Sequence, residues 1–248
     1  YKGNPYHVPG LIEEEMVTLD KKKNPAFEVC DAIYFLAYKD GKVVGRIAGM
    51  INRRSNETWN QKHARFGFVD FIDDIEVVDA LFGAVEKWAK EQGMDALHGP
   101  MGFTDMDHEG MLIEGFDQIG TMATIYNYPY YPKQMERMGY TKDQDWHEFK
   151  IYIPDGVPEK HLRIGEIVKK PKVIDLYLTG VLPEYQSKGV NALLFNDLIP
   201  VYKSVGAIYA ESNPELETNN AVQAQWDYFK REHHKTRRAY IKQLKGKS

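Results

Sequence analysis

Residues 186–191 combine the features of an anion-binding loop. The loop consists of Gln186, Ser187, Lys188, Gly189, Val190 and Asn191. An apolar run over 173–181 precedes it, and a helical pattern begins at Ala192. The first amides of a helix have no partner inside the helix, and the helix dipole adds roughly half a positive charge there. Gly189 allows the backbone to approach a ligand closely. The sequence therefore predicts a site for a phosphorylated cofactor.

Strands and helices that would position this loop are expected along the whole chain. Asp40-Gly41 between two apolar runs predicts a β-hairpin, and Gly93 predicts the end of a helix. The expected strands are 32–38, 43–50, 64–71, 95–100, 148–153, 173–181, 206–211 and 238–244, and the expected helices are 11–22, 76–92, 130–139, 192–203 and 219–230. This order predicts an α+β fold with mixed, mostly antiparallel sheets flanked by helices.

The loop pattern Gln186-x-x-Gly189-x-Asn191 resembles the Gln/Arg-x-x-Gly-x-Gly/Ala pyrophosphate loop of the GNAT acyltransferases, which bind coenzyme A. Asn191 replaces the usual small residue, and asparagine tolerates unusual backbone angles better than most residues. The expected elements follow the order of a GNAT domain in residues 29–153 and repeat its later part in residues 154–248. The resemblance implies a tandem GNAT-like fold in which residues 1–28 form an N-terminal arm.

The two halves are expected to differ in their cofactor loops. The helix of the first half follows Asp73, Asp74 and Glu76 without a glycine, and these carboxylates would repel a pyrophosphate. We therefore expect the first half to keep the fold with a degenerate cofactor loop. Before the cofactor strand of the second half, only 159–169 stands where a GNAT domain has a helix pair and a meander. Either this branch lost a segment near 168–173 or the chain omits it, and we favour omission.

Longer strings resemble one bacterial GNAT-related family, which includes bacterial ceramide synthase-like proteins. They are Gly3–Pro9, Gly99–Phe103, Glu114–Asp117, Tyr130-Tyr131 with Gly139-Tyr140, Gly180–Leu194 and Ala210–Glu217. This resemblance implies acyl-CoA chemistry more firmly than it implies a substrate. The acceptor that it implies is a sphingoid long-chain amine.

Acyl transfer from a thioester needs a deprotonated amine and a stabilised tetrahedral oxyanion. In GNAT proteins a backbone N–H of the strand before the loop supports the thioester carbonyl, and the matching positions are Thr179, Gly180 and Val181. The matching proton donor for the departing thiolate is Tyr228, unless this side chain is packed in the core. Glu211 ends a strand beside the expected cleft, and a carboxylate with a pKa raised by burial could take the amine proton. The residues around Glu211 could equally serve only to shape a turn.

Other polar and aromatic groups have simpler interpretations. His147, His233 and His234 are weaker candidates for the base, and the pair in the tail is expected to be solvated. Residues 104–110 begin like a calcium loop, but Phe116 stands where the loop needs a glutamate, so we expect no metal. Four tyrosines form either core or the wall of a lipid-chain channel. They are Tyr126, Tyr128, Tyr130 and Tyr131.

Composition narrows the class of partner. The net charge of the 248-residue chain is −4, which disfavours nucleic acid as a partner. The single cysteine and the absence of an 18-residue apolar run favour a cytoplasmic location. The basic tail from Lys230 to Ser248 contains one acid, Glu232. It is either a solvated segment or a contact to an anionic membrane surface or to coenzyme A phosphates, and the second alternative allows a location peripheral to the inner membrane.

Two functions from different classes follow. One is an N-acyltransferase that moves an acyl group from coenzyme A to an amine, with acyl-CoA as a substrate and no metal. The alternative is a non-catalytic protein that keeps a GNAT scaffold to bind acyl-CoA, lipid or a partner. The intact loop at 186–191 favours the first. Gly189 is not followed by Lys-Ser/Thr, so the loop is no P-loop, and a Gly-x-Ser-x-Gly elbow is absent from the sequence.

Overall fold

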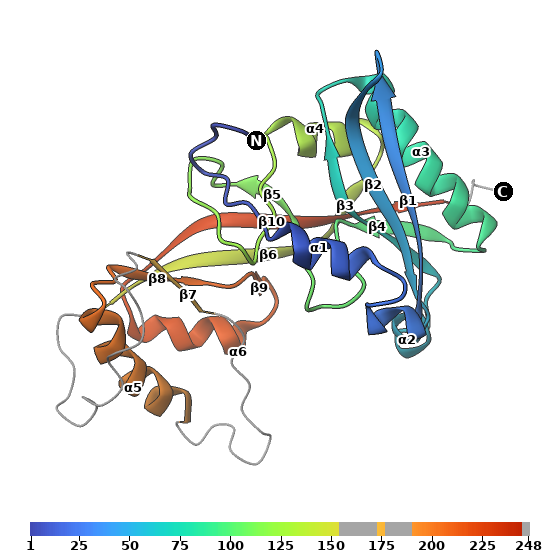
Figure 1. The fold of residues 1–248 in the computed structure, drawn as a ribbon. Coiled ribbons are helices and arrows are strands. Elements are labelled where there is room, and N and C mark those ends of the chain that lie inside the picture. Colours follow the sequence, from blue (N-terminus) through green and yellow to red (C-terminus); the bar gives the residue numbers. More distant parts are fainter. Residues whose placement is uncertain (154–172, 177–189, 245–248) are drawn as a thin grey trace. The chain divides into compact units, whose positions relative to one another are not determined.

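The computed structural model describes residues 1–153, 173–176 and 190–244 (Figure 1). The chain divides into two compact units. Unit 1 consists of Tyr1–Trp146 and Thr236–Ser248, and unit 2 consists of His147–Lys235. The sequence assigned residues 236–248 to the second half, whereas the structure includes them in unit 1. The segment near 168–173, from which we expected residues to be missing, lies almost entirely outside the described residues.

Unit 1 is a sheet with helices on its faces. Its elements are α1 (Ile12–Leu19), a 3-10 helix η1 (Pro25–Glu28), β1 (Cys30–Lys39), β2 (Lys42–Asn52), α2 (Arg53–Thr58), β3 (His63–Phe71), α3 (Ile75–Glu91), β4 (Ala96–Gly99), β5 (Met111–Glu114) and α4 (Tyr130–Arg137). β1 and β2 form the predicted hairpin, and Asp40 and Gly41 at its turn have φ of 51° and 73°. Two successive positive φ angles match the twist of the flanking strands. β2 pairs antiparallel with β3, and β3 pairs parallel with β4.

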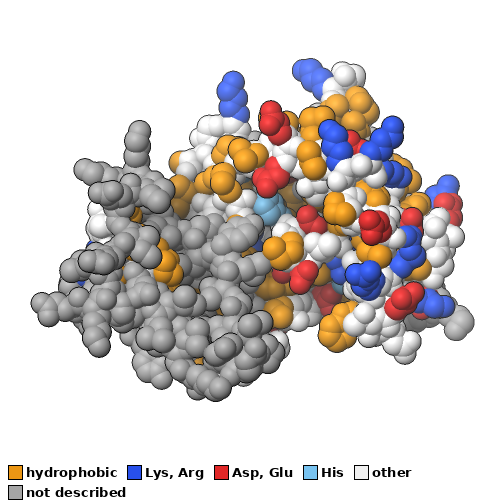
Figure 2. Space-filling model, turned by 60° about the horizontal axis from the view of Figure 1, so that its bottom comes forward, with side chains coloured by type: hydrophobic (Ala, Val, Ile, Leu, Met, Phe, Trp, Pro, Cys, Tyr) orange, Lys and Arg blue, Asp and Glu red, His pale blue; other side chains and the backbone are white. Residues whose placement is uncertain are grey.

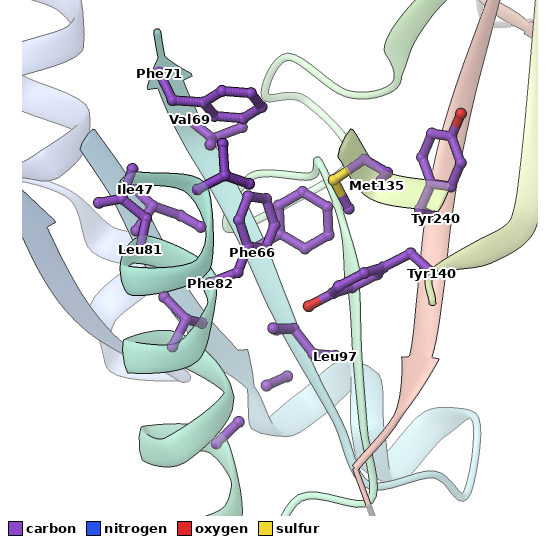
Figure 3. Close-up of a cluster of buried hydrophobic side chains, with 14 of the residues drawn as sticks. Ile47, Phe66, Val69, Phe71, Leu81, Phe82, Leu97, Met135, Tyr140 and Tyr240 are labelled. Atoms are coloured by element: carbon purple, nitrogen blue, oxygen red, sulfur yellow. The ribbon is translucent and has the colours of Figure 1, made fainter. Parts of the chain in front are cut away.

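Helix α3 forms the core of unit 1 with one face of this sheet. Its buried side chains recur at helical spacing and are Val77, Val78, Leu81, Phe82, Val85 and Ala89. The ring of Phe82 packs against the rings of Phe66 of β3 and Tyr140, with centroids 5.1 Å and 5.6 Å away, and Phe66 and Tyr140 also contact each other (Figure 3). Gly93 follows the helix with φ of 74°, as its predicted role as a C-terminal cap requires. On the other face, Phe27 packs against Phe103.

Two long strands, β6 (Thr141–Tyr152) and β10 (Arg231–Gln243), contribute residues to both units. In unit 1, Tyr240–Gln243 of β10 pairs antiparallel with β4, and residues 236–238 pair with β5. In unit 2, Lys150–Tyr152 of β6 pairs antiparallel with a strand described below. The sequence predicted only the ends of these strands, at 148–153 and 238–244. Their earlier residues are rich in charged side chains, which hid the strand pattern.

The expectation of a solvated basic tail is wrong for residues 235–237 and 239–240, which are buried, whereas Lys230, Glu232 and His233 are exposed. β10 is an interior strand of the sheet, and Lys235 and Arg237 are each 1% exposed. Arg238 forms a bidentate pair with Asp145, with N–O distances of 2.7 and 2.8 Å. Lys242 donates to Glu86 over 2.8 Å. Lys235 and Arg237 are thus buried, and Arg238 and Lys242, which are partly exposed, are paired with carboxylates of the protein.

Unit 2 repeats the strand–helix–strand arrangement of unit 1. Its elements are β7 (Val173–Leu176), α5 (Val190–Ser204), β8 (Tyr209–Ser212), β9 (Glu215–Leu216), α6 (Asn220–Gln223) and a 3-10 helix η3 (Ala224–Tyr228). β7 pairs parallel with β8, and β8 pairs antiparallel with β6. The helix expected over 219–230 is therefore a short α-helix followed by a 3-10 turn. Its last carbonyl, that of Gln223, accepts a hydrogen bond from Arg231 Nη1 over 3.1 Å.

The helices of the described residues are short or polar, and the visible surface is mixed in charge. Within these residues, every helix is too short or too polar to cross a bilayer. On the face drawn in Figure 2, acidic and basic side chains are interspersed with apolar ones over the surface that is not grey. Charges of both signs thus share this face.

We expect Gly67→Ala to destabilise unit 1 by about 1–3 kcal/mol or more, because a Cβ at this position of β3 would lie 2.1 Å from the carbonyl oxygen of Met101. Gly83→Ala in α3 is the matched control. A Cβ there meets nothing within 4 Å, and the loss of a helical glycine should stabilise by about 0.5–1 kcal/mol. Urea unfolding measures both, and equal midpoints for the two variants would contradict the packing of β3 against Met101.

Candidate active site

The carboxyl ends of β7 and β8 mark the candidate site in unit 2. Leu176 and Ser212, the last residues of the two strands, lie opposite each other in the parallel register. α5 connects the strands, so its first residue, Val190, lies at the same edge of the sheet. Open α/β sheets bind ligands at this edge, and the first amides of α5 lack partners within the helix. The arrangement suits an anion at the start of α5.

The structure describes only some of the predicted site residues. Most predicted cofactor residues lie outside the described ranges: Thr179, Gly180, Val181, Gln186, Ser187, Lys188 and Gly189. Val190 and Asn191, which the sequence placed in the loop, are the first two residues of α5, so the helix begins two residues earlier than expected. Tyr228 is the last residue of η3. Glu211 lies in β8, and its side chain is fully described.

The equivalent edge of unit 1 is closed by its own residues. Only Ile72, Asp73 and Asp74 separate β3 from α3. The carboxylate of Asp74 accepts hydrogen bonds from the backbone N–H groups of Glu76 and Val77, at 2.9 and 3.3 Å. Lys39 also pairs with Asp74, and the hydrogen bond from Lys39 lowers the pKa of this carboxyl. A side chain thus takes the place that an anionic ligand would occupy.

Aromatic side chains fill the space where β3 and β4 diverge. The two strands pair only over residues 63–65 of β3. Beyond this point the ring of Tyr131 stacks on Phe71 at 4.0 Å, and the Tyr131 hydroxyl accepts from the Phe71 N–H over 3.1 Å. Tyr1 of the N-terminal arm donates to Asp70 over 2.9 Å and lies 3.0 Å from the Tyr131 hydroxyl. Of the four tyrosines singled out in the sequence, Tyr126 and Tyr131 are buried, and Tyr128 and Tyr130 are half-buried against the core of unit 1.

Glu211 is buried as expected, but its carboxylate is already engaged. Its side chain is 1% exposed, and its Oε1 lies 2.6 Å from His234 Nε2 and 2.8 Å from Lys235 Nζ. His234 is 2% exposed, so the expectation that it is solvated is wrong. A carboxylate held by an ammonium and an imidazole within the protein interior is poorly placed to take a proton from an incoming amine.

Lys235 joins two buried carboxylates. Its Nζ also lies 2.8 Å from Oε2 of Glu148, whose side chain is fully buried. Glu148 comes from β6, Glu211 from β8, and Lys235 and His234 from β10. We call these four residues the Lys235 network. It ties three strands of unit 2 together, since an ammonium removed from between two buried carboxylates would leave both uncompensated.

Glu215, four residues after Glu211, is also buried, but it lies beside a tryptophan instead of a lysine. Its side chain is 9% exposed, and Oε1 accepts a hydrogen bond from Trp226 Nε1 over 2.6 Å. Burial raises the pKa of Glu215 to about 7, against the opposing effects of the Trp226 hydrogen bond and the charge of Arg231. Its other oxygen, Oε2, is buried and receives no hydrogen bond from the described residues. A carboxyl with this pKa can exchange a proton near neutral pH.

Asn213 adds a second acceptor to the same turn. Its Oδ1 is buried and, like Glu215 Oε2, has no hydrogen-bond donor among the residues that the structure describes. Asn213 and Pro214 connect β8 to β9, so both acceptors follow the carboxyl end of β8. Two open acceptors at this edge provide a place for a ligand that donates hydrogen bonds.

An apolar pocket lies on the Trp226 side of unit 2. It is a small, partly open pocket with a cavity volume of about 20 Å³. Phe195 and Ile199 of α5, Ile151 of β6, Trp226 of η3 and Phe229 are among its lining residues. Trp226 contributes its ring to this pocket and its N–H to Glu215. The arrangement suits an aliphatic group beside a polar one.

Sequence reasoning missed several of these residues. Glu148 and Lys235 stand in charged runs that resemble solvent-exposed segments, and no local signal marks them as partners 87 positions apart. Glu215 and Asn213 do lie in the string Ala210–Glu217 that carries the family resemblance. That string was a usable signal, but it does not distinguish Glu211 from Glu215.

In fold, the chain is a tandem GNAT-like protein. A structure described as a tandem GNAT protein from the clavulanic acid biosynthesis pathway, without AcCoA, superimposes with a TM-score of 0.56. The comparison covers 89% of this chain and 85% of the other, at 12% sequence identity. The predicted fold, mixed sheets flanked by helices, is confirmed.

Two curated bacterial proteins are similar in sequence. Protein YghO of Escherichia coli (strain K12) is 35% identical over 145 residues, which are 58% of this chain and 37% of that protein. A bacterial ceramide synthase of Caulobacter vibrioides is 29% identical over 157 residues, which are 63% of this chain and 41% of that protein. The predicted resemblance is thereby confirmed, and the chain spans about two fifths of the length of either relative. No family model matches the chain.

We expect Lys235→Met to lower the free energy of unfolding by about 3–5 kcal/mol, because it leaves two buried carboxylates without their ammonium. The triple variant Lys235→Met, Glu148→Gln, Glu211→Gln removes the charges together and should recover most of this loss. Lys150→Met on β6 is the control, since this lysine is only half-buried and its ammonium lies 5.5 Å from the centroid of the Tyr209 ring. Urea unfolding of the four proteins is the measurement. A Lys235→Met variant as stable as the control would contradict a supporting role of the Lys235 network.

Proposed function

We propose that the protein is an acyl-CoA-dependent N-acyltransferase and that unit 2 carries its cofactor site. The observation that carries this proposal is the parallel pair β7 and β8 with α5 between them, in a fold similar to that of a tandem GNAT protein. α5 begins at Val190, directly after the loop whose sequence resembles a coenzyme A pyrophosphate loop. In this proposal, residues 186–191 hold the pyrophosphate and residues 179–181 support the thioester carbonyl.

The proposal assigns the cofactor to unit 2 alone. In unit 1 the start of α3 is capped by Asp74, and Tyr131 and Phe71 stack where β3 leaves β4. A pyrophosphate there would meet a carboxylate instead of free amides. In this proposal unit 1 serves only as a scaffold. The alternative, non-catalytic function therefore applies to unit 1, because Asp74 and the stacked rings occupy the place of a cofactor there.

The proposed acceptor is an amine with a long aliphatic chain. The relative in Caulobacter vibrioides carries the name bacterial ceramide synthase, and a ceramide is the N-acyl product of a sphingoid amine. The apolar pocket lined by Phe195, Ile199 and Trp226 supports an aliphatic substrate. Such a substrate fits a protein that works in the cytoplasm beside the inner membrane. Since Lys235 and Arg237 are buried, the basic tail is not the proposed membrane contact.

We expect coenzyme A or palmitoyl-CoA to raise the melting temperature of the protein, because a ligand at a hundredfold excess over Kd stabilises the folded state by about 2.7 kcal/mol. Gly189→Trp should abolish this shift by blocking the approach of the phosphates to the loop. Gly10→Trp is the control, because a side chain at this exposed glycine meets nothing within 4 Å. A shift retained in Gly189→Trp would contradict the assigned loop.

Thiol release separates the two functions. Palmitoyl-CoA with the sphingoid amine sphinganine should yield free coenzyme A, detected by a thiol reagent, only when protein and amine are both present. Binding without release would leave the non-catalytic scaffold as the better description.

A further inference from the structure

We propose that Asn213 and Glu215 form the amine-acceptor site of unit 2, and that Glu215 rather than Glu211 removes the proton from the amine. The inference rests on the proposed acyl transfer and names the residues that receive the acceptor. The evidence is two buried oxygen atoms without hydrogen-bond donors among the described residues, in the turn that follows β8.

Buried polar atoms in folded proteins have a hydrogen-bond partner in the great majority of cases. Oε2 of Glu215 and Oδ1 of Asn213 are both buried, and neither receives a hydrogen bond from the described residues. Both are acceptors that need a donor. A primary ammonium has three N–H donors and no acceptor, so it matches the chemistry that these two oxygens leave open.

The position of the turn agrees with this ligand. Asn213 and Pro214 follow the last residue of β8, and β9 begins at Glu215. The carboxyl end of β8 lies at the same edge as the start of α5, where the proposal above places the pyrophosphate. The amine and the thioester would therefore meet at one edge of unit 2.

The environment of Glu215 gives it the properties of a base. Its pKa of about 7 results chiefly from burial, so a substantial fraction of the carboxyl is ionised at neutral pH. The charged side chain that acts on it is Arg231 of β10, which pairs with Asp227 of η3 at 2.6 Å. The carboxylates of β6 and β8, Glu148 and Glu211, are paired with Lys235. Glu211 lacks the open oxygen that Glu215 has.

The step balances without a further reactant. The ammonium of the acceptor loses one proton to Glu215, and the free amine attacks the thioester carbonyl carbon. A C–N bond forms and the C–S bond breaks, which expels the thiolate of coenzyme A. The second proton of the nitrogen passes to that thiolate, and Glu215 returns its proton to solvent. The products are the amide and free coenzyme A.

The first test measures kcat/KM for thiol release from palmitoyl-CoA with sphinganine between pH 5.5 and 9. The wild-type protein should show a rising limb with a midpoint near pH 7, set by deprotonation of Glu215. Glu215→Gln should lose the limb and roughly a hundredfold or more of the rate, as the loss of a general base implies. Glu217→Gln, two residues further on, is the matched control and should keep both. A Glu215→Gln variant that keeps the limb and the rate within a fewfold overturns the inference.

The second test does not depend on turnover. Octylamine is titrated against the protein by thermal shift, with octanol as the uncharged control of equal length. The wild type should respond to octylamine more than to octanol, and both Glu215→Gln and Asn213→Leu should lose the difference. If Glu215→Gln does not fold, the Asn213→Leu variant still tests the amine site. Equal responses of wild type and variants overturn the amine site. If the wild type binds octylamine through these residues but releases no thiol, the amine site stands and the proposed acyl transfer fails.

Discussion

The pairing of the long strands β10 and β6 is the constraint on which both units depend. In each unit a helix joins two parallel strands, and the second of these, β4 or β8, needs an antiparallel neighbour on its other side. β10 supplies it in unit 1 and β6 supplies it in unit 2. A strand edge left without such a neighbour exposes a row of unpaired N–H and C=O groups. Each unit is therefore completed by a strand that begins or ends in the other.

This shared frame carries two different strand–helix connections. Between β3 and α3 the connection is three residues, and the carboxylate of Asp74 consumes the free amides of the helix. β7 ends at Leu176 and α5 begins at Val190, and the sequence between them contains most of the proposed pyrophosphate loop. In the proposed function, the two units differ in ligand binding because Asp74 caps α3 and aromatic side chains pack beside it in unit 1. In unit 1 the stacking of Tyr131 on Phe71 stabilises the fold at the place where a bound ligand would lie in a cofactor-binding unit.

Local signals predicted much of the fold, and partners distant in sequence account for what was missed. Asp40-Gly41 and Gly93 fix backbone angles within a few residues, so the hairpin and the end of α3 could be predicted from the sequence. The first half of β10 could not, because its charges are compensated by residues far away in the chain, as Lys235 is by Glu148. In the proposed site, the sequence singled out the string Ala210–Glu217 by its resemblance. It did not show which glutamate pairs with Lys235 and which retains an open oxygen.

Glu211 and Glu215 illustrate how environment separates two similar side chains. Glu211 meets the ammonium of Lys235, whereas Glu215 meets the neutral N–H of Trp226 in an apolar setting that raises its pKa to about 7. Two carboxyl groups with different surroundings can then have different roles in one site. The Lys235 network fixes β6, β8 and β10 relative to one another, and β8 leads directly into the turn that carries Asn213 and Glu215. In the proposed site the buried ion pairs act through position, because they hold the strand that leads into the turn with the two open acceptors.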